Sequence, residues 1–202
     1  GAIFVSTLQF GGVLETRSLD GERVPTADEK KEIITHQQTN PNNYVEELMY
    51  TYKSDKSRDD HSYVKLYNMI FANIRHSITN ITEIGISHGQ SIQAWFRYFP
   101  NSDIHGFDVR WYDNDTVKNN LEHLKPRVHS HIVDILDDNV NMTELGFMPE
   151  SMDIIIDDGP HTVSAQEGFL KKLFVCLKPG GYYIIEDIGI TGGGKTSNKR
   201  YS

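Results

Sequence analysis

Two pairs of acidic residues follow apolar runs in the second half of the sequence, and a histidine lies close to the first pair. In chain order they are Asp157, Asp158 and His161 after the run at 154–156, and Glu186 and Asp187 after the run at 182–185. Apolar runs of this length are typical of buried parallel strands. Ligands of open parallel sheets bind just beyond the carboxyl ends of the strands. The spacing therefore brings several carboxylates and one imidazole to the place where such folds do chemistry.

Carboxylates that share one cleft repel one another unless a cation neutralises them. Hard cations bind oxygen ligands, so a divalent cation is the simplest partner for such a cluster. The alternative for any single acid at the end of a strand is a helix cap. The alternative for His161 is a structural hydrogen bond.

The elements that position these residues alternate between strand and helix from residue 81 onward. Strands are predicted at 81–86, 103–109, 127–135, 151–158 and 181–188, and helices at 91–98, 117–124 and 164–177. Alternation of this kind predicts an α/β, Rossmann-like three-layer sandwich with a mostly parallel central sheet. A hairpin (2–8 and 13–19) and helices at 26–38, 42–52 and 60–76 are predicted before it.

Length and composition indicate one globular domain. We expect an N-terminal hairpin and helical extension at 1–78, a cofactor-binding core at 79–190 and a flexible tail at 191–202. The net charge is −8 and the basic residues form no stripe, which argues against nucleic-acid or anionic-membrane partners. No apolar run of membrane-spanning length and no signal peptide is found, so we expect a cytoplasmic protein. Because the chain starts directly in a strand-like segment, it is also a candidate for one module of a larger multidomain chain.

The turn after the first predicted strand of the core carries glycine at positions 85 and 89. The dinucleotide fingerprint G-x-G-x-x-G is not matched, so nicotinamide binding is poorly supported. Asp108 ends the next strand, about twenty residues on, where an acid can bind the ribose hydroxyls of any adenosine cofactor. A tight turn with a helix cap remains the alternative for this segment.

Taken together, these acids resemble a known superfamily. Residues 80–190 resemble a class I S-adenosylmethionine-dependent methyltransferase. The resemblance depends on an acid two residues before Gly85, on the acids Asp108, Asp134 and Asp157, and on Lys-Pro-Gly-Gly at 178–181. The D-D-G-x-H and E-D motifs resemble the metal-dependent sugar O-methyltransferases that act on macrolide glycosides and rhamnosyl groups. Ser54-Asp55-Lys56, His61, Tyr63 and Tyr67 resemble an upstream element of the same group. The chain also resembles the methyltransferase module of a large-virus glycan-building enzyme.

The resemblance implies transfer of a methyl group to a sugar hydroxyl, as in a deoxyhexose such as rhamnose within a glycan or glycoside. It implies an S-adenosylmethionine site at Glu83, Gly85, Ser91, Asp108, Asp134 and Asp157. It also implies a Mg²⁺ or Mn²⁺ ion ligated by Asp158, Glu186 and Asp187, with His161 as the general base. Substrate or lid contacts are implied for Lys56, His61 and Tyr63. A metal-assisted base suits this reaction, because a sugar hydroxyl is a poor acid and an imidazole accepts protons near neutral pH.

Strand geometry sets conditions on the implied metal site. Asp158 can meet Glu186 and Asp187 if their strands are neighbours, since neighbouring strands lie about 4.8 Å apart. Consecutive strand residues face opposite sides, so Asp157 and Asp158 can serve different ligands. Glu186 and Asp187 can share one ion only if the backbone leaves the strand between them.

Three points stay open at this stage. The superfamily usually adds two strands after the fifth, whereas a short tail follows here, and the hairpin at 2–19 is a candidate to fill that edge. A metal-dependent oxygenase or hydrolase would use the same acids and histidine. A non-catalytic glycan-binding module would keep the fold without the reaction.

Overall fold

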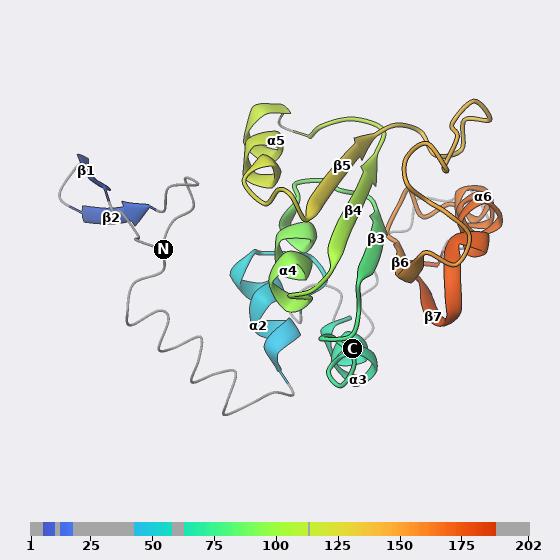
Figure 1. Ribbon diagram of the computed structural model, residues 1–202, viewed down its shortest axis with the longest axis horizontal. Coiled ribbons are helices and arrows are strands. Elements are labelled where there is room, and N and C mark those ends of the chain that lie inside the picture. Colours follow the sequence, from blue (N-terminus) through green and yellow to red (C-terminus); the bar gives the residue numbers. More distant parts are fainter. Residues whose placement is uncertain (1–5, 11–12, 18–42, 58–62, 113, 189–202) are drawn as a thin grey trace, which may run out of the picture.

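A five-stranded parallel sheet forms the centre of the computed structural model, which describes residues 6–10, 13–17, 43–57, 63–112 and 114–188 (Figure 1). The strands are β3 (Asn80–Ile84), β4 (Asp103–Asp108), β5 (Val128–Ile132), β6 (Met152–Asp157) and β7 (Leu177–Ile185). Their order is β5-β4-β3-β6-β7, and every pairing is parallel. The chain runs outward from β3 through β4 to β5 and then crosses to β6, so the strand order reverses beside β3. Ligands bind at the carboxyl ends of the strands at such a switch point.

Helices cover both faces of this sheet, which confirms the predicted three-layer sandwich. The helices are α2 (Tyr44–Thr51), α3 (Val64–Phe71), α4 (Gln90–Tyr98), α5 (Asn114–Glu122) and α6 (Val163–Leu173), with a 3-10 turn at Phe174–Cys176. Ile154 and Ile156 of β6 pack with α2, α3, α4 and α5, whereas Ile155 packs with α6 on the other face. The alternation follows from the two-residue period of a strand. Strand β6 is therefore buried on both sides, as its apolar run predicts.

The last strand differs from its prediction. Strand β7 begins at Leu177 and includes Lys178–Gly181, which the sequence places at the stop of the preceding helix. Helix α6 ends earlier, at Leu173. Strand β7 is also less buried than β6, because it pairs with β6 on one side and ends the described sheet on the other. Residues 182–185 are therefore a half-buried edge segment.

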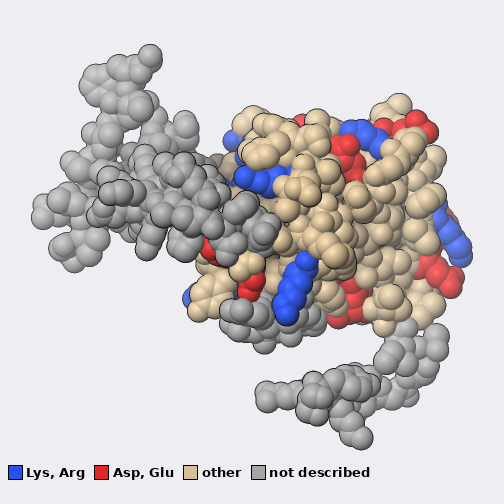
Figure 2. All heavy atoms as spheres, turned by 90° about the horizontal axis from the view of Figure 1, so that it is seen from below, with Lys and Arg blue, Asp and Glu red and all other residues tan. Residues whose placement is uncertain are grey.

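The N-terminal hairpin forms, with β1 (Ser6–Phe10) antiparallel to β2 (Val13–Arg17). It is a two-stranded sheet of its own, so the expectation that it fills the edge beside β7 is wrong. The predicted helix at 26–38, His61 and the tail at 191–202 lie outside the described residues. Within the described part of the chain, no helix is long and apolar enough to cross a membrane. On the face seen in Figure 2, the lysines and arginines of the described part lie apart and among acidic residues.

Candidate active site

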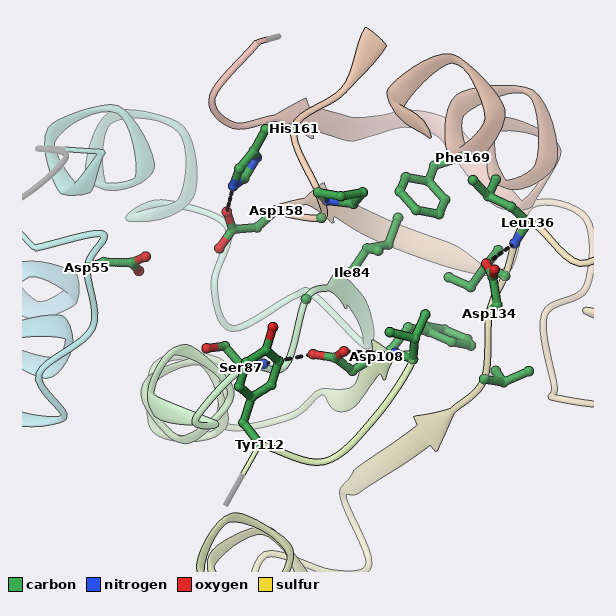
Figure 3. Close-up of a pocket in the computed structure, with 17 residues that line it drawn as sticks. Asp55, Ile84, Ser87, Asp108, Tyr112, Asp134, Leu136, Asp158, His161 and Phe169 are labelled. Atoms are coloured by element: carbon green, nitrogen blue, oxygen red, sulfur yellow. Dashed lines mark hydrogen bonds and ion pairs between the residues drawn. The ribbon is translucent and has the colours of Figure 1, made fainter. Parts of the chain in front are cut away.

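A pocket of about 510 Å³ opens at the carboxyl ends of the strands (Figure 3). Its walls come from four turns, each of which follows a different strand of the sheet. They contribute Gly85 and Ser87 after β3, Asp108 and Val109 at the end of β4, Asp134 after β5, and Asp158, Gly159 and His161 after β6. The predicted convergence of strand ends on one cleft is thus confirmed, and Asp55 faces it from the segment after α2.

Three side chains offer ligand atoms that all lie within 4.8 Å of one another: Asp158 and His161, which line the pocket, and Asp187. We call them the outer group. The Nε2 atom of His161 is 3.9 Å from Oδ1 of Asp158 and 3.9 Å from Oδ2 of Asp187. Both His161 (φ +55°) and Asp187 (φ +45°) adopt the left-handed backbone conformation that side-chain-bearing residues rarely take. Strain of this kind clusters at functional sites, where the surrounding structure enforces it.

Tyrosine Tyr63 fixes the orientation of Asp187. Its hydroxyl donates to Oδ1 of Asp187 at 2.6 Å and accepts from the Asp187 backbone N–H at 3.1 Å. Burial, together with the hydrogen bond to Asp187, raises the pKa of Tyr63 to about 12, so the hydroxyl keeps its proton at neutral pH. Tyr63 therefore supports the outer group.

Glu186 points away from the outer group, although it precedes Asp187 directly. Strand β7 ends at Ile185, and the left-handed turn at Asp187 sends the two acidic side chains in different directions. Glu186 is 2% exposed; it accepts from the Tyr67 hydroxyl through Oε1 and lies 3.1 Å from Nζ of Lys56 through Oε2. Burial raises the pKa of Glu186 to about 8, against the opposing charge of Lys56. The role of Glu186 as a metal ligand stays a prediction.

Beneath the pocket, Lys56 joins three carboxylates. Its Nζ lies 3.2 Å from Oε1 of Glu83 and 3.1 Å from Oε2 of Glu186, and it also pairs with Oδ2 of Asp158. We call Glu83, Asp158 and Glu186 the inner cluster. Lys56 is only 1% exposed and is not among the residues that line the pocket. Its predicted contact with a substrate or its place in a lid stays a prediction.

Two predicted cofactor residues, Glu83 and Ser91, lie in this lower layer. Ser91 donates to Oε2 of Glu83 at 2.9 Å, and the indole N–H of Trp95 donates to the same oxygen at 3.1 Å. Burial raises the pKa of Glu83 to about 7, while Lys56 acts in the opposite direction. Neither residue is among those that line the pocket. Their proposed contact with the cofactor stays a prediction.

Of the remaining predicted cofactor residues, Gly85, Asp108 and Asp134 line the pocket, whereas Asp157 does not. Asp108 accepts from the N–H groups of Ile86 and Ser87 at 3.1 and 3.0 Å, so it holds the turn after β3 closed. Asp134 accepts from the N–H of Leu136 at 2.9 Å and lines the pocket. Asp157 is fully buried, and burial raises its pKa.

One oxygen of Asp157 lacks a donor. Its Oδ1 atom accepts from the N–H of Gly159 at 3.2 Å, whereas Oδ2 is buried and has no hydrogen-bond partner among the described residues. Buried polar atoms almost always have a partner, so a group outside the described residues, such as water or a ligand, is needed to supply the donor.

Two supporting residues of the site were not expected from the sequence. Gln166 of α6 donates to the backbone carbonyls of Glu186 and Asp187 at 3.1 and 3.3 Å, and so holds the turn that carries both acids. The sequence does contain a signal for Gln166: it lies on the same apolar stripe of the helix as Phe169 and Leu173, which indicates a buried polar side chain. The second is Trp95 of α4, whose indole N–H donates to Glu83.

Comparison with known proteins identifies what this arrangement is similar to. No family model matches the chain. A 2'-O-methyltransferase of 8-demethyl-8-alpha-L-rhamnosyl tetracenomycin C from Streptomyces olivaceus is 30% identical over 135 residues, which are 63% of this chain and 33% of that protein. The L-olivosyl-oleandolide 3-O-methyltransferase of Streptomyces antibioticus is 28% identical over 162 residues, 77% of this chain and 40% of that protein. The chain thus spans between one third and two fifths of the length of these relatives.

A solved structure gives the same picture for the fold. The MycE methyltransferase from mycinamycin biosynthesis, in complex with Mg, SAH and mycinamycin VI, superposes with a TM-score of 0.61 at 22% identity. The match covers 90% of this chain and 52% of that one. These findings confirm the class I methyltransferase fold and the resemblance to sugar O-methyltransferases that the motifs predicted.

Proposed function

We propose that this chain is an S-adenosylmethionine-dependent, divalent-metal-assisted O-methyltransferase that acts on a sugar hydroxyl. The observation that carries the proposal is the outer group, two of whose members, Asp158 and His161, line a pocket formed by the turns after β3, β4, β5 and β6. A methyl donor bound along the other turns would lie in the same cavity as a hydroxyl placed beside His161. The relatives that the chain resembles are named as O-methyltransferases of sugar-bearing compounds.

The cofactor side of the pocket fits S-adenosylmethionine. Gly85 lets the backbone approach a ligand closely, and Asp108 and Asp134 place carboxylates along the wall. Asp157 is fully buried and does not line the pocket, so its contact with the cofactor stays a prediction. S-adenosylmethionine supplies an activated methyl group, so the protein has only to orient the acceptor oxygen and remove its proton.

The outer group fits a divalent cation. Asp158 and Asp187 offer carboxylate oxygens close enough to share one Mg²⁺ or Mn²⁺ ion, and Glu186 is the predicted third ligand. His161 is assigned the role of base and not of ligand. The cation, when bound, supplies positive charge that makes a nearby hydroxyl more acidic. His161 is partly exposed at the pocket, so its Nε2 can take the proton of a hydroxyl placed there.

The test combines binding and turnover on the full chain. S-adenosylhomocysteine is titrated with and without Mg²⁺, and transfer of a tritiated methyl group to methyl α-L-rhamnoside and to rhamnose-containing glycans is measured. His161→Ala should lower kcat by about 10²–10⁴-fold and leave S-adenosylhomocysteine binding intact. The exposed His76, which lies before β3 at the opposite end of the sheet, provides the control His76→Ala.

Other outcomes point to other functions. A chain that binds no S-adenosylhomocysteine refutes the proposal. Oxygen consumption or bond hydrolysis without methyl transfer would indicate the oxygenase or hydrolase alternative. Sugar binding that survives His161→Ala, in a chain without turnover, would indicate a glycan-binding module. The cytoplasmic location, the absence of nucleic-acid partners, the place in a longer chain and the division at residues 78 and 190 stay predictions.

A further inference from the structure

The contacts of Lys56 divide the acidic residues of the site into two layers. Its ammonium contacts all three carboxylates of the inner cluster: Glu83, Asp158 and Glu186. The outer group lies on the other side of Asp158, whose Oδ1 faces His161 while its Oδ2 faces Lys56. Asp158 is thus shared between a layer that holds a side-chain cation and a layer suited to a divalent ion.

The inner cluster needs a positive partner when its carboxylates are ionised. Glu83 and Glu186 are 0% and 2% exposed, so water cannot stabilise their negative charge. The Nζ atom of Lys56 is the group that meets all three carboxylates. An ammonium surrounded by three carboxylate oxygens has the environment that an oxygen-ligated metal ion would have.

From this geometry, and resting on the proposed metal-assisted function, we propose that Lys56 is a positioning residue whose ammonium stands in for a second divalent cation. It neutralises the inner cluster and thereby limits the number of exchangeable metal ions bound at the acidic site to one per chain. Because the lysine is tethered, it also keeps Asp158 in one orientation, with Oδ1 toward the outer group.

Removal of the ammonium tests the inference directly. Lys56→Met keeps most of the length of the side chain and deletes only its charge, which leaves three carboxylates around an uncharged tip. We expect Mn²⁺ to enter the vacated place, so that electron paramagnetic resonance titration finds about one more ion per chain than in the wild type. Mn²⁺ should also raise the melting temperature of Lys56→Met by more than that of the wild type, since it binds the folded state alone.

Two further variants separate charge from structure. Lys65 of α3 is exposed, so Lys65→Met makes the same change in net charge away from the site and should leave the Mn²⁺ count unchanged. The double variant Lys56→Met with Glu83→Gln removes one carboxylate of the inner cluster along with the ammonium, and Glu83 is not a predicted ligand of the first ion. This double variant should lose the additional Mn²⁺ ion.

The outcomes distinguish this inference from the proposed function. If Lys56→Met binds no more Mn²⁺ than the wild type, the inference is overturned. Lys56 would then have a merely structural role, or protons would neutralise the inner cluster in its place. If the wild type binds no Mn²⁺ but Lys56→Met does, the inference stands and the metal-assisted function falls. One ion in the wild type and a second in Lys56→Met supports both.

Discussion

The turn after β3 leaves no room for a side chain at Gly85. The substitution Gly85→Ala therefore tests how strongly the site depends on the close approach of this turn to Asp158. Gly85 has φ +101°, and a Cβ at this position would lie 2.2 Å from the carbonyl oxygen of Asp158. To reach an ordinary van der Waals separation, the two chain segments would have to part by about 1 Å. Gly146 offers a matched control, because it has a similar φ of +89° and nothing within 4 Å of the added Cβ.

The two substitutions share one cost and differ in another. Left-handed backbone conformation costs a non-glycine residue about 1–2 kcal/mol in both places. Overpacking adds about 1–3 kcal/mol at Gly85 alone. Denaturant titration should therefore show a loss of about 2–5 kcal/mol in the free energy of unfolding for Gly85→Ala, and about 1–2 kcal/mol for Gly146→Ala.

The displaced carbonyl belongs to a residue of the outer group, so function should suffer more than stability. A shift of about 1 Å in a catalytic group costs about 10²-fold in rate. We expect Gly85→Ala to weaken Mn²⁺ binding and to lower kcat about 10²-fold under conditions where the protein is fully folded. Equal destabilisation by both alanines, with Mn²⁺ affinity unchanged in Gly85→Ala, would refute the reasoning that Gly85 and Asp158 form one contact.

Two further predictions concern single side chains. Asp158→Asn should abolish Mn²⁺-dependent turnover when metal is added back to the metal-free protein. Calorimetry should still detect binding of S-adenosylhomocysteine to this variant. Full activity of the wild type after verified metal removal would contradict the prediction. Burial, with His129 and His131 nearby, lowers the pKa of His105 in the folded protein to about 3. The ordinary pKa of histidine is about 6.5, so below that pH the unfolded chain binds a proton at His105 and the folded protein does not. Going from pH 8 to pH 5 should therefore cost about 2 kcal/mol of stability at this side chain. His105→Phe should remove that loss in pH-dependent unfolding, and the exposed control His123→Phe should retain it.

Local sequence patterns were sufficient where the site depends on strand ends. The apolar run before Asp157 and Asp158 predicts a buried strand that stops at a polar turn, and β6 does end at Asp157. Strands β6 and β7 are neighbours, which meets the condition for Asp158 and Asp187 to converge. These features follow from the two-residue period and the parallel topology, and both can be read from nearby residues.

Local patterns were insufficient for Lys56. It lies in the polar segment after α2, where a solvated lysine is the ordinary expectation, yet its ammonium meets Asp158 and Glu186 across 102 and 130 residues of sequence. Its burial accompanies ion pairs with carboxylates that are distant in the sequence. Neighbouring residues carry no signal for such contacts.

Asp158 is the residue through which these effects combine. Its carbonyl oxygen limits the turn at Gly85, its backbone N–H donates to the carbonyl of Ile84 at 3.0 Å, and its two carboxylate oxygens face Lys56 and His161. A change on the cofactor side, in the inner cluster or in the outer group therefore reaches the same side chain. The Gly85 and Lys56 variants approach Asp158 from different sides, so they should disturb metal binding in opposite directions. Gly85→Ala moves a ligand and should weaken binding, whereas Lys56→Met uncovers negative charge and should admit an additional ion. If both variants changed metal binding in the same direction, Asp158 would not be the shared element.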